Sequence, residues 1–552
     1  MKNLPCMAKL AGMALAAALL VAGTQAQQTR AEAEKDPVLK AMLTEMDRST
    51  SHLQLAGFAK PYFIQYRVVD LDEFTARATF GASTGAGRAH QRVAVVNVRV
   101  GDRKVDSSNG RGDSAVELAA LDNDEIALRS ALWSATDQAY KAALATYAQK
   151  QAALKQVQTP PQADDFSEEK PIVSLDHPAH LELGKSAWEQ RMEHASGIYR
   201  TAENDLLAGG VVEYTSAEFH ARATTTWIVT SEGTIVRKGA TAYEENFAAS
   251  TQASDGMSLN RSYASTGVSL ADLDAEAVFE KHARGLLASL GALRQAPLVE
   301  DEYHGPVLLS SDASADALHS LLAPGLAAVR PKLGTEARTV GAFASSYHAR
   351  VLPEFIDVVD DPGLTSYNGK GLIGAYAVDD EGLAAEAVKV IEAGKLENYL
   401  IGRQPVRDFP HSNGHGRASA GSAARPSIGV LKATAREGLS DEELDKKLIE
   451  IAKDRGLDHV YFVETLGGIH SPRLLYRVAT DGKRTLVRGS ALGDMDQRTL
   501  RSGIEAAGKD LFVANYFEDV PVTVLAPSLL VGDATLRRAN EKNEKLPFYP
   551  AP

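Results

Sequence analysis

The densest group of side chains able to do chemistry lies in the stretch His411-Ser-Asn413-Gly-His415-Gly-Arg417. Imidazole, carboxamide and guanidinium groups can bind a metal ion, move a proton or hold an acidic group. Two histidines four residues apart chelate a metal best on a helix, and the interleaved glycines disfavour a helix here. The stretch predicts a flexible loop of the kind that often lines binding sites, with a purely solvated loop as the alternative. We therefore name His411, Asn413, His415 and Arg417 as candidate substrate-groove residues.

A second candidate is His319, on a helix predicted from about Ser314 to Leu322. The helix reads Asp316-Ala-Leu-His319-Ser-Leu-Leu-Ala-Pro324 and is otherwise largely apolar. A single histidine on such a surface is typical of a core or interface position rather than of a ligand. We therefore assign no catalytic role to it.

Two matches to familiar motifs lack the structural context that their chemistry needs. The pattern Gly81-Ala-Ser-Thr-Gly85 resembles a nucleophile elbow, but it lies between two predicted strands instead of between a strand and a helix. The pattern Gly369-Lys-Gly-Leu-Ile-Gly374 resembles a dinucleotide fingerprint, which requires a helix N-terminus directly after it. Here the acidic turn Asp379-Asp-Glu-Gly382 follows instead. We interpret the first pattern as a hairpin and the second as a glycine-rich bend.

The elements that must position these residues do not alternate strand and helix one for one, which favours an α+β fold. We expect a mixed N-terminal domain with an antiparallel sheet and helices over 35–295, a β-rich C-terminal domain over 300–535, and a polar tail over 536–552. The predicted strands and hairpins are 62–69, 92–100, 211–220, 221–230, 234–247 and 388–400. The predicted helices are 126–154, 188–204, 272–290 and the one that follows the capping box at Ser440.

With these residues in order, the second half resembles the TldD/PmbA family of metallopeptidases and their non-catalytic partners. The resemblance covers most of 35–535 and depends on the order of several segments rather than on one motif. The segments are Val307-Leu-Leu309, Val358-Val-Asp-Asp361, Asp379-Asp-Glu-Gly382, Val388–Leu400, Asn413-Gly-His-Gly-Arg417, Arg425-Pro-Ser427 and Val524–Leu530, with Lys60–Arg67 in the first half.

The resemblance implies a helix that, in the peptidase subunit, carries a His-Glu-x-x-x-His zinc motif. His319 falls in the place of the first histidine, Ser320 in that of the glutamate and Pro324 in that of the second histidine. A hydrolytic zinc site needs three protein ligands and a base for the bound water, and neither replacement supplies these. The family peptidases also take a ligand from a cysteine near the C-terminus, and the sole cysteine here is Cys6. We expect no zinc and no other cofactor in this chain.

These features predict the zinc-free partner subunit of an exported peptide-processing complex. The resemblance implies a hollow dimer, formed with a zinc-bearing TldD-like homologue or as a homodimer, that acts on peptide substrates. Two alternatives stay open. One is an active metallopeptidase with rearranged ligands, in which His411, His415 and a carboxylate hold the metal. The other is a binding or scaffold protein without enzymatic activity.

Residues 1–26 have the three parts of a secretory signal peptide. Lys2 and Lys9 form a positive region, Leu10–Ala22 is an apolar run, and small residues lead to a cleavage site near Ala26. The run is too short for a membrane anchor, and no later stretch is long and apolar enough to span a bilayer. We expect a periplasmic or extracellular protein.

The net charge of −13 argues against nucleic acid as a partner, because an acidic surface repels phosphate. The mature chain after Ala26 has no cysteine. Exported proteins are often stabilised by disulfides, so this one must depend on a packed core alone. Its length is ample for such a core.

Overall fold

The computed structural model describes residues 30–108, 114–157, 163–200, 212–300, 302–493 and 495–539. Its first half contains a seven-stranded sheet in the order β3-β2-β1-β5-β6-β4, with β7 paired to β6. All pairings in this sheet are antiparallel except that of β4 with β6. The strands are β1 (Pro61–Thr79), β2 (Ala82–Val100), β3 (Ser114–Leu118), β4 (Val173–Leu175), β5 (Tyr214–Thr230), β6 (Ile235–Gln252) and β7 (Ser258–Gly267).

The hairpin of β1 and β2 is much longer than the two short strands predicted at 62–69 and 92–100. Its tight turn has positive φ at Phe80 and Gly81, the geometry that matches the twist of paired strands. Ser83 therefore lies inside β2, where it donates to Glu189, and the elbow-like pattern is part of a hairpin as predicted. Cross-strand ion pairs such as Arg88–Asp72 stabilise the polar middle of the hairpin, and such pairs are invisible to a search for alternating apolar residues.

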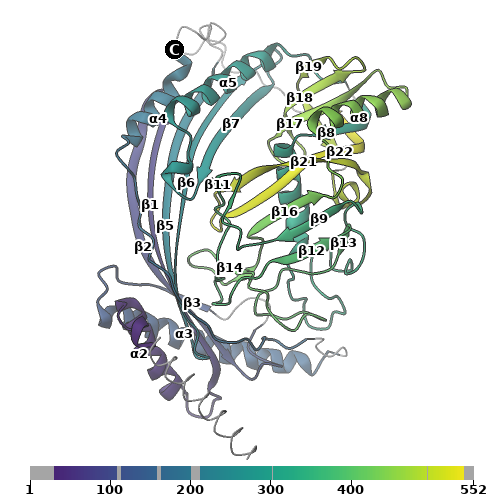
Figure 1. Ribbon diagram of the computed structural model, residues 1–552. Helices are drawn as coiled ribbons and strands as arrows, with labels where there is room; N and C mark the ends of the chain where they lie inside the picture. The colour runs from purple at the N-terminus through teal and green to yellow at the C-terminus, as the bar shows by residue number, and fades with distance from the viewer. Residues whose placement is uncertain are drawn as a thin grey trace, which may run out of the picture.

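Helices cover one face of this sheet. α2 (Pro37–His52) and α3 (Glu125–Leu154) pack at one end, and α4 (Trp188–Gly197) and α5 (Glu276–Gln295) pack at the other (Figure 1). Even-numbered residues of β1 such as Tyr66 and Val68 face these helices, so odd-numbered residues such as Arg67 and Val69 face the opposite way. That second face looks toward the C-terminal half of the chain.

The C-terminal half contains an eleven-stranded mixed sheet in the order β13-β12-β9-β16-β22-β8-β17-β18-β19, with β20 and β21 paired to β22. The pairs β16–β22 and β17–β8 are parallel. The strands are β8 (Glu302–Leu309), β9 (Ile356–Asp360), β12 (Val388–Glu392), β13 (Lys395–Leu396), β16 (Val430–Ala435), β17 (His459–Leu466), β18 (Pro472–Ala479), β19 (Arg484–Val487), β20 (Ser490–Gly493), β21 (Ile504–Tyr516) and β22 (Val522–Arg538). The α+β prediction is therefore confirmed.

Short elements connect these strands. The small strands are β10 (Ser366–Tyr367), β11 (Lys370–Gly371), β14 (Gly416–Arg417) and β15 (Arg425–Pro426). The helices are α6 (Ser311–Ala317), α7 (Ala323–Leu326) and α8 (Asp441–Asp454), and the π-helical turn η3 (Leu318–Leu322) joins α6 to α7. A π-helical turn inside a helix often marks a functional position. The glycine-rich bend predicted at 369–374 begins as the turn between β10 and β11.

Several predicted boundaries can be compared with the structure. The hairpin at 388–400 is present as β12 and β13, and the capping box at Ser440 begins α8. β22 continues to Arg538, so residues 536–538 belong to the sheet and not to the tail, because Leu536 is buried against β8 and β20. The predicted signal peptide at 1–26 and residues 540–552 lie outside the described residues.

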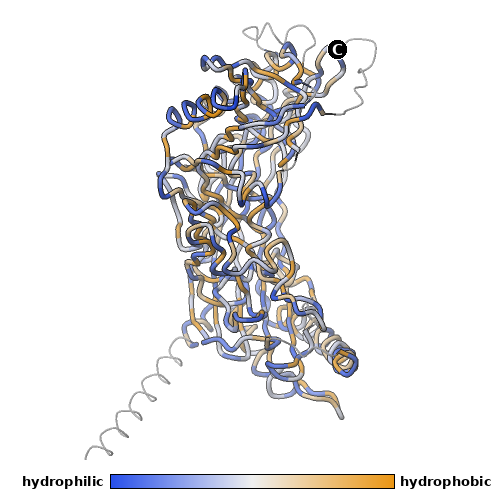
Figure 2. The backbone as a smooth tube through the Cα atoms, turned by 90° about the vertical axis from the view of Figure 1, so that its right-hand side faces the viewer, coloured by the Kyte–Doolittle hydropathy of each residue, from blue (hydrophilic) through white to orange (hydrophobic). Residues whose placement is uncertain are grey.

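The molecule is elongated in the view of Figure 2, and hydrophilic and hydrophobic residues are mixed along its length. None of the helices within the described ranges has the length and apolarity needed to cross a bilayer. The helix predicted at 188–204 ends at Gly197 and is followed by a 3₁₀ turn to Arg200.

Replacement of Ser440 by alanine should loosen the first turn of α8. The Ser440 hydroxyl accepts the Glu443 N–H, and the Glu443 carboxylate accepts the Ser440 N–H. Losing an N-cap of this kind lowers the stability of the helix by about 1 kcal/mol. Backbone amides of residues 441–447 should therefore exchange with solvent about fivefold faster. The matched control is Ser51→Ala in α2, where the hydroxyl only bonds the Asp47 carbonyl within the helix. Unchanged exchange in Ser440→Ala would show that the box does not hold the helix end.

Candidate functional site

Two cavities lie between the open face of the N-terminal sheet and the C-terminal half. The arginine cavity has a volume of about 420 Å³ and is lined by residues that include Arg99, Arg330 and Arg403. The sheet cavity has a volume of about 480 Å³ and is lined by one face of β1, β5 and β6. Arg67 and Asp380 line both, so the two cavities adjoin at these residues.

The acidic turn Asp379–Glu381 projects from the C-terminal half to this junction. Asp379 is buried, and its carboxylate accepts the backbone N–H groups of Glu381, Leu383 and Gly416, which fixes the shape of the turn. Burial, with the nearby Glu381 carboxylate, raises the pKa of Asp379 to about 7. Gly382 has φ +82°, and a Cβ there would lie 2.9 Å from a methyl of Thr234, so the turn packs closely on the N-terminal half.

Asp380 joins the two halves by an ion pair. Its Oδ1 lies 2.8 Å from Nζ of Lys238 on β6, and its Oδ2 lies 3.7 Å from Nε of Arg417. Lys238 also donates to the carbonyl of Val378. Although burial opposes ionisation, Lys238, Arg417 and Arg67 together lower the pKa of Asp380 to about 2. Asp380 is therefore a carboxylate at any physiological pH.

Glu381 is held by close packing against two glycines. Its Oε2 accepts the Arg403 N–H at 2.6 Å, and burial raises its pKa. A Cβ built on Gly402 or Gly416 would lie 2.5 Å or 2.2 Å from that same oxygen, closer than real atoms approach. Only glycine at these two positions lets the backbone come this near to the carboxylate.

Arg67 is the buried charge at the centre of the junction, with 4% of its surface exposed. Its guanidinium donates to the carbonyl oxygens of Ser419 and Ser422. Burial lowers the pKa of Arg67, although Asp380 and Glu381 attract its charge from a distance. No carboxylate of the described residues forms an ion pair with it within 4.0 Å. This arrangement leaves a buried cation with hydrogen bonds but no direct counter-ion.

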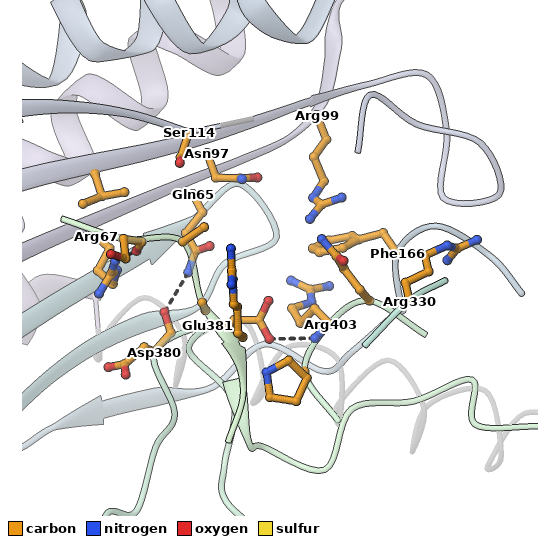
Figure 3. A pocket seen from close by; sticks show the side chains of 18 of the residues that line it. Gln65, Arg67, Asn97, Arg99, Ser114, Phe166, Arg330, Asp380, Glu381 and Arg403 are labelled. Carbon is orange, nitrogen blue, oxygen red and sulfur yellow. Dashed lines mark hydrogen bonds between the residues drawn. The ribbon is translucent and has the colours of Figure 1, made fainter. Parts of the chain in front are cut away.

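Three other arginines of the arginine cavity each form an ion pair with a carboxylate. Arg99 and Arg403 stack on the two faces of the Phe166 ring, with guanidinium carbons 4.1 Å and 4.0 Å from its centroid (Figure 3). The ion pairs are Arg99–Asp106 at 2.7 Å, Arg330–Asp165 at 2.8 Å and Arg403–Glu232 at 2.8 Å. These pairs fix the arginines in place and offset their charge, while the guanidinium groups remain part of the cavity wall.

The four candidate groove residues are separated by the structure. Arg417 lines the sheet cavity, where its guanidinium lies 4.2 Å from the ring centroid of Tyr376. Asn413 is used internally, because its side chain bonds the backbone of Tyr399 and Ile401. His411 is 70% exposed at its side chain. Neither Asn413 nor His411 lines either cavity.

His415 has a structural environment. It is fully buried, with Nε2 3.1 Å from Oδ1 of Asp360 and Nδ1 3.0 Å from the Asn413 side-chain oxygen. His411 instead faces Glu169 at 3.7 Å, so the two histidines approach different carboxylates. Over the described ranges, no three His, Cys, Asp or Glu side chains gather in a way that could hold a metal ion. The pair His411 and His415 thus does not form a chelating site in this conformation.

His319 lies on the π-helical turn η3, against β21. Its ring stacks on Tyr516 with centroids 4.1 Å apart, and its Nε2 lies 3.8 Å from Oε1 of Glu518. The Tyr516 hydroxyl donates to the Asp316 carboxylate at 2.8 Å. Asp312 lies one helical turn before Asp316, and burial raises the pKa of Asp312 to about 6. The residues around His319 do not fit the zinc set that the resemblance implies. Ser320 and Pro324 stand where the base and a ligand would be required.

The C-terminal half of the chain matches a known family model. Residues 302–538 match the family model described as PmbA/TldA metallopeptidase C-terminal domain. The C-terminal half is therefore similar to the C-terminal domain of that family. The match covers the eleven-stranded sheet from β8 to the end of β22. No curated protein matches the chain.

Solved structures resemble the whole fold. A putative modulator of a DNA gyrase from Thermotoga maritima has 16% identity and a TM-score of 0.56, over 86% of this chain and 96% of that one. TldE from Thermococcus kodakarensis has 14% identity and a TM-score of 0.56, over 90% and 99%. A putative modulator of DNA gyrase from Bacteroides thetaiotaomicron has 12% identity and a TM-score of 0.54, over 90% and 98%. At these identities the likeness establishes the fold alone.

Sequence reasoning did not identify Arg67, Lys238 or Asp380 as site residues. Arg67 ends the segment Lys60–Arg67, and Asp380 is in the acidic turn, so both lie in segments that carried the family resemblance. The sequence offered one signal for these two residues. Arg67 is a positive charge within a predicted strand, and the acidic turn that contains Asp380 is a cluster of negative charge that could attract it. Lys238 had no such signal, because nothing in its neighbourhood indicates a distant partner.

Replacement of Asp380 by asparagine should destabilise the contact between the halves. It leaves Lys238 without its buried partner, which typically costs about 3 kcal/mol. Calorimetric unfolding at pH 7 should therefore shift to lower temperature, whereas Glu392→Gln, which removes an exposed ion pair with Lys389, should leave it unchanged. The folded pKa of Asp380 is depressed, so its contribution is present at neutral pH and is lost as pH falls below about 4 toward 2.

The difference in unfolding temperature between wild type and Asp380→Asn should therefore shrink as the pH falls from about 4 toward 2. An Asp380→Asn protein that unfolds at the wild-type temperature at pH 7 would contradict this role for the ion pair.

Proposed function

We propose that this protein is the zinc-free partner subunit of an exported complex that processes peptides. One observation carries the proposal. A domain similar to the C-terminal domain of the TldD/PmbA family, which is named for metallopeptidases, has serine and proline where the resemblance requires the glutamate and second histidine of the zinc helix. His319, the one retained residue, is engaged with Tyr516 and Glu518.

The remaining parts of the proposal follow from the sequence and from one neighbour. TldE from Thermococcus kodakarensis shares this fold, and we propose by analogy a partner that resembles TldD. The predicted signal peptide supports a location of this chain outside the cytoplasm, and we propose the same location for its partner. In such a complex this chain would supply a wall of the peptide groove, and the two cavities beside Arg67 and Asp380 are the surfaces suited to it.

Purified protein should contain no stoichiometric zinc and should not cleave peptides by itself. The measurement is elemental analysis after dialysis against zinc, followed by a peptide-cleavage assay on the protein alone and with a zinc-bearing homologue from the same organism. We expect cleavage only with the homologue, and coelution of the two chains on size exclusion. His319→Ala should leave the metal content unchanged.

One zinc ion per chain together with cleavage by the protein alone would overturn the proposal. It would favour the metallopeptidase with rearranged ligands, and the variant His411→Ala with His415→Ala would then test that ligand set directly. Absence of any zinc-bearing partner in a pull-down from the native organism would favour a scaffold protein instead.

A further inference from the structure

The arginine cavity has more positive than negative side chains on its wall. Five arginines line it, and its acidic lining residues are Asp380 and Glu381. Asp380 is paired with Lys238, which belongs to the wall of the neighbouring sheet cavity, and Glu381 accepts a backbone N–H of Arg403. Both carboxylates thus have partners within the protein, and so do Arg99, Arg330 and Arg403, which pair with Asp106, Asp165 and Glu232.

Arg67 differs from three other arginines of this wall. Arg99, Arg330 and Arg403 each have a carboxylate at 2.7–2.8 Å, whereas Arg67 bonds only the carbonyls of Ser419 and Ser422. A buried cation without a counter-ion is costly to maintain. A carboxylate bound in the cavity would supply that counter-ion, and a planar guanidinium is the group best suited to grip a carboxylate.

Asn97 adds an acceptor to the same wall. Its side-chain oxygen is buried and has no hydrogen-bond partner among the described residues. The side-chain amide of the neighbouring Gln65 donates instead to the carbonyl oxygen of Asp380. Figure 3 shows Asn97 and Gln65 on the sheet side of the cavity, across from Glu381 and Arg403. An unpartnered acceptor calls for an N–H donor. A peptide end offers both complements, a carboxylate for Arg67 and an amide N–H for Asn97.

The segment that Arg67 holds separates the two cavities. Residues 418–421 line the sheet cavity and residues 422–426 line the arginine cavity, and Arg67 bonds a carbonyl in each part. The stretch Ala418-Ser-Ala-Gly-Ser-Ala-Ala424 has only small side chains. A ligand carboxylate would compete with these carbonyls for the Arg67 donors.

We infer that the arginine cavity binds the C-terminal carboxylate of a peptide, with Arg67 as the charge that recognises it and Asn97 as the acceptor for an adjacent amide. The inference rests on the proposed function, because it names how this subunit would hold a peptide in the groove. The cavity volume of about 420 Å³ is that of a small-ligand site and accommodates the last residues of a peptide, not a folded chain.

The experiment compares matched peptides that differ only in the charge of their C-terminus. N-acetylated tripeptides ending in alanine, leucine or phenylalanine are titrated into the full mature protein by calorimetry, each as free acid and as C-terminal amide. We expect the best acid to bind about tenfold more tightly than its amide, the order of one charge-assisted hydrogen bond. Equal binding of acid and amide, or binding of neither, would overturn the inference.

Variants separate the two contacts. Arg67→Gln should abolish the preference for the acid, and Arg67→Lys should retain part of it. Asn97→Leu should weaken the binding of the peptide acid and of the peptide amide by the same factor. The matched control is Arg88→Gln, the same substitution on β2 of the same sheet, where Arg88 pairs with Asp72 on the opposite face. An acid preference that survives Arg67→Gln would overturn the assignment, and so would an Asn97→Leu that binds both peptides as wild type does.

Competition by small anions and a second Arg67 variant distinguish peptide binding from other causes of the same result. Acetate and inorganic phosphate are used as competitors, and displacement of the peptide acid by either at equal concentration would show a small-anion site and overturn the peptide assignment. If Arg67→Gln fails to fold, the acid and amide comparison on wild type and on Arg67→Lys still decides. The zinc and partner measurements are independent, so loss of the carboxylate site would leave the proposed partner role standing.

Discussion

The ion pair between Lys238 and Asp380 is the contact on which the site depends. Lys238 lies on the long sheet of the N-terminal half and Asp380 on the acidic turn of the C-terminal half, and their atoms meet at 2.8 Å. Because the pair is largely buried, its geometry is tightly specified, and it sets where the turn meets the sheet. Both cavities border Asp380, so their shape follows from this one placement.

The turn itself is built so that three successive acids have three different roles. Asp379 shapes the backbone by accepting three N–H groups, Asp380 pairs across the halves, and Glu381 is packed between glycines. Their pKa values separate accordingly, with Asp379 raised by burial and Asp380 lowered by cations. A run of like charges is thereby tolerated because each carboxylate has its own environment.

The helical segment around His319 is held by packing contacts. His319 stacks on Tyr516, and Tyr516 donates to Asp316 on the same helical segment. Phe517 and Glu518, which follow Tyr516, reach Arg222 of the N-terminal sheet. The segment therefore takes part in joining the two halves.

The sequence alone determined the class of fold, the hairpin at 388–400, the capped helix after Ser440 and the failure of the glycine motifs, because these depend on neighbouring residues. The expectation of no zinc also came from local chemistry, because the resemblance puts Ser320 in the place of a base and Pro324 in the place of a ligand, roles that these side chains do not supply. Only the tertiary structure decided that His415 is buried while Arg417 lines a cavity, since both lie in one polar stretch. The pairing of Asp380 with Lys238 likewise depends on residues more than 100 positions apart, and no local pattern records such a meeting.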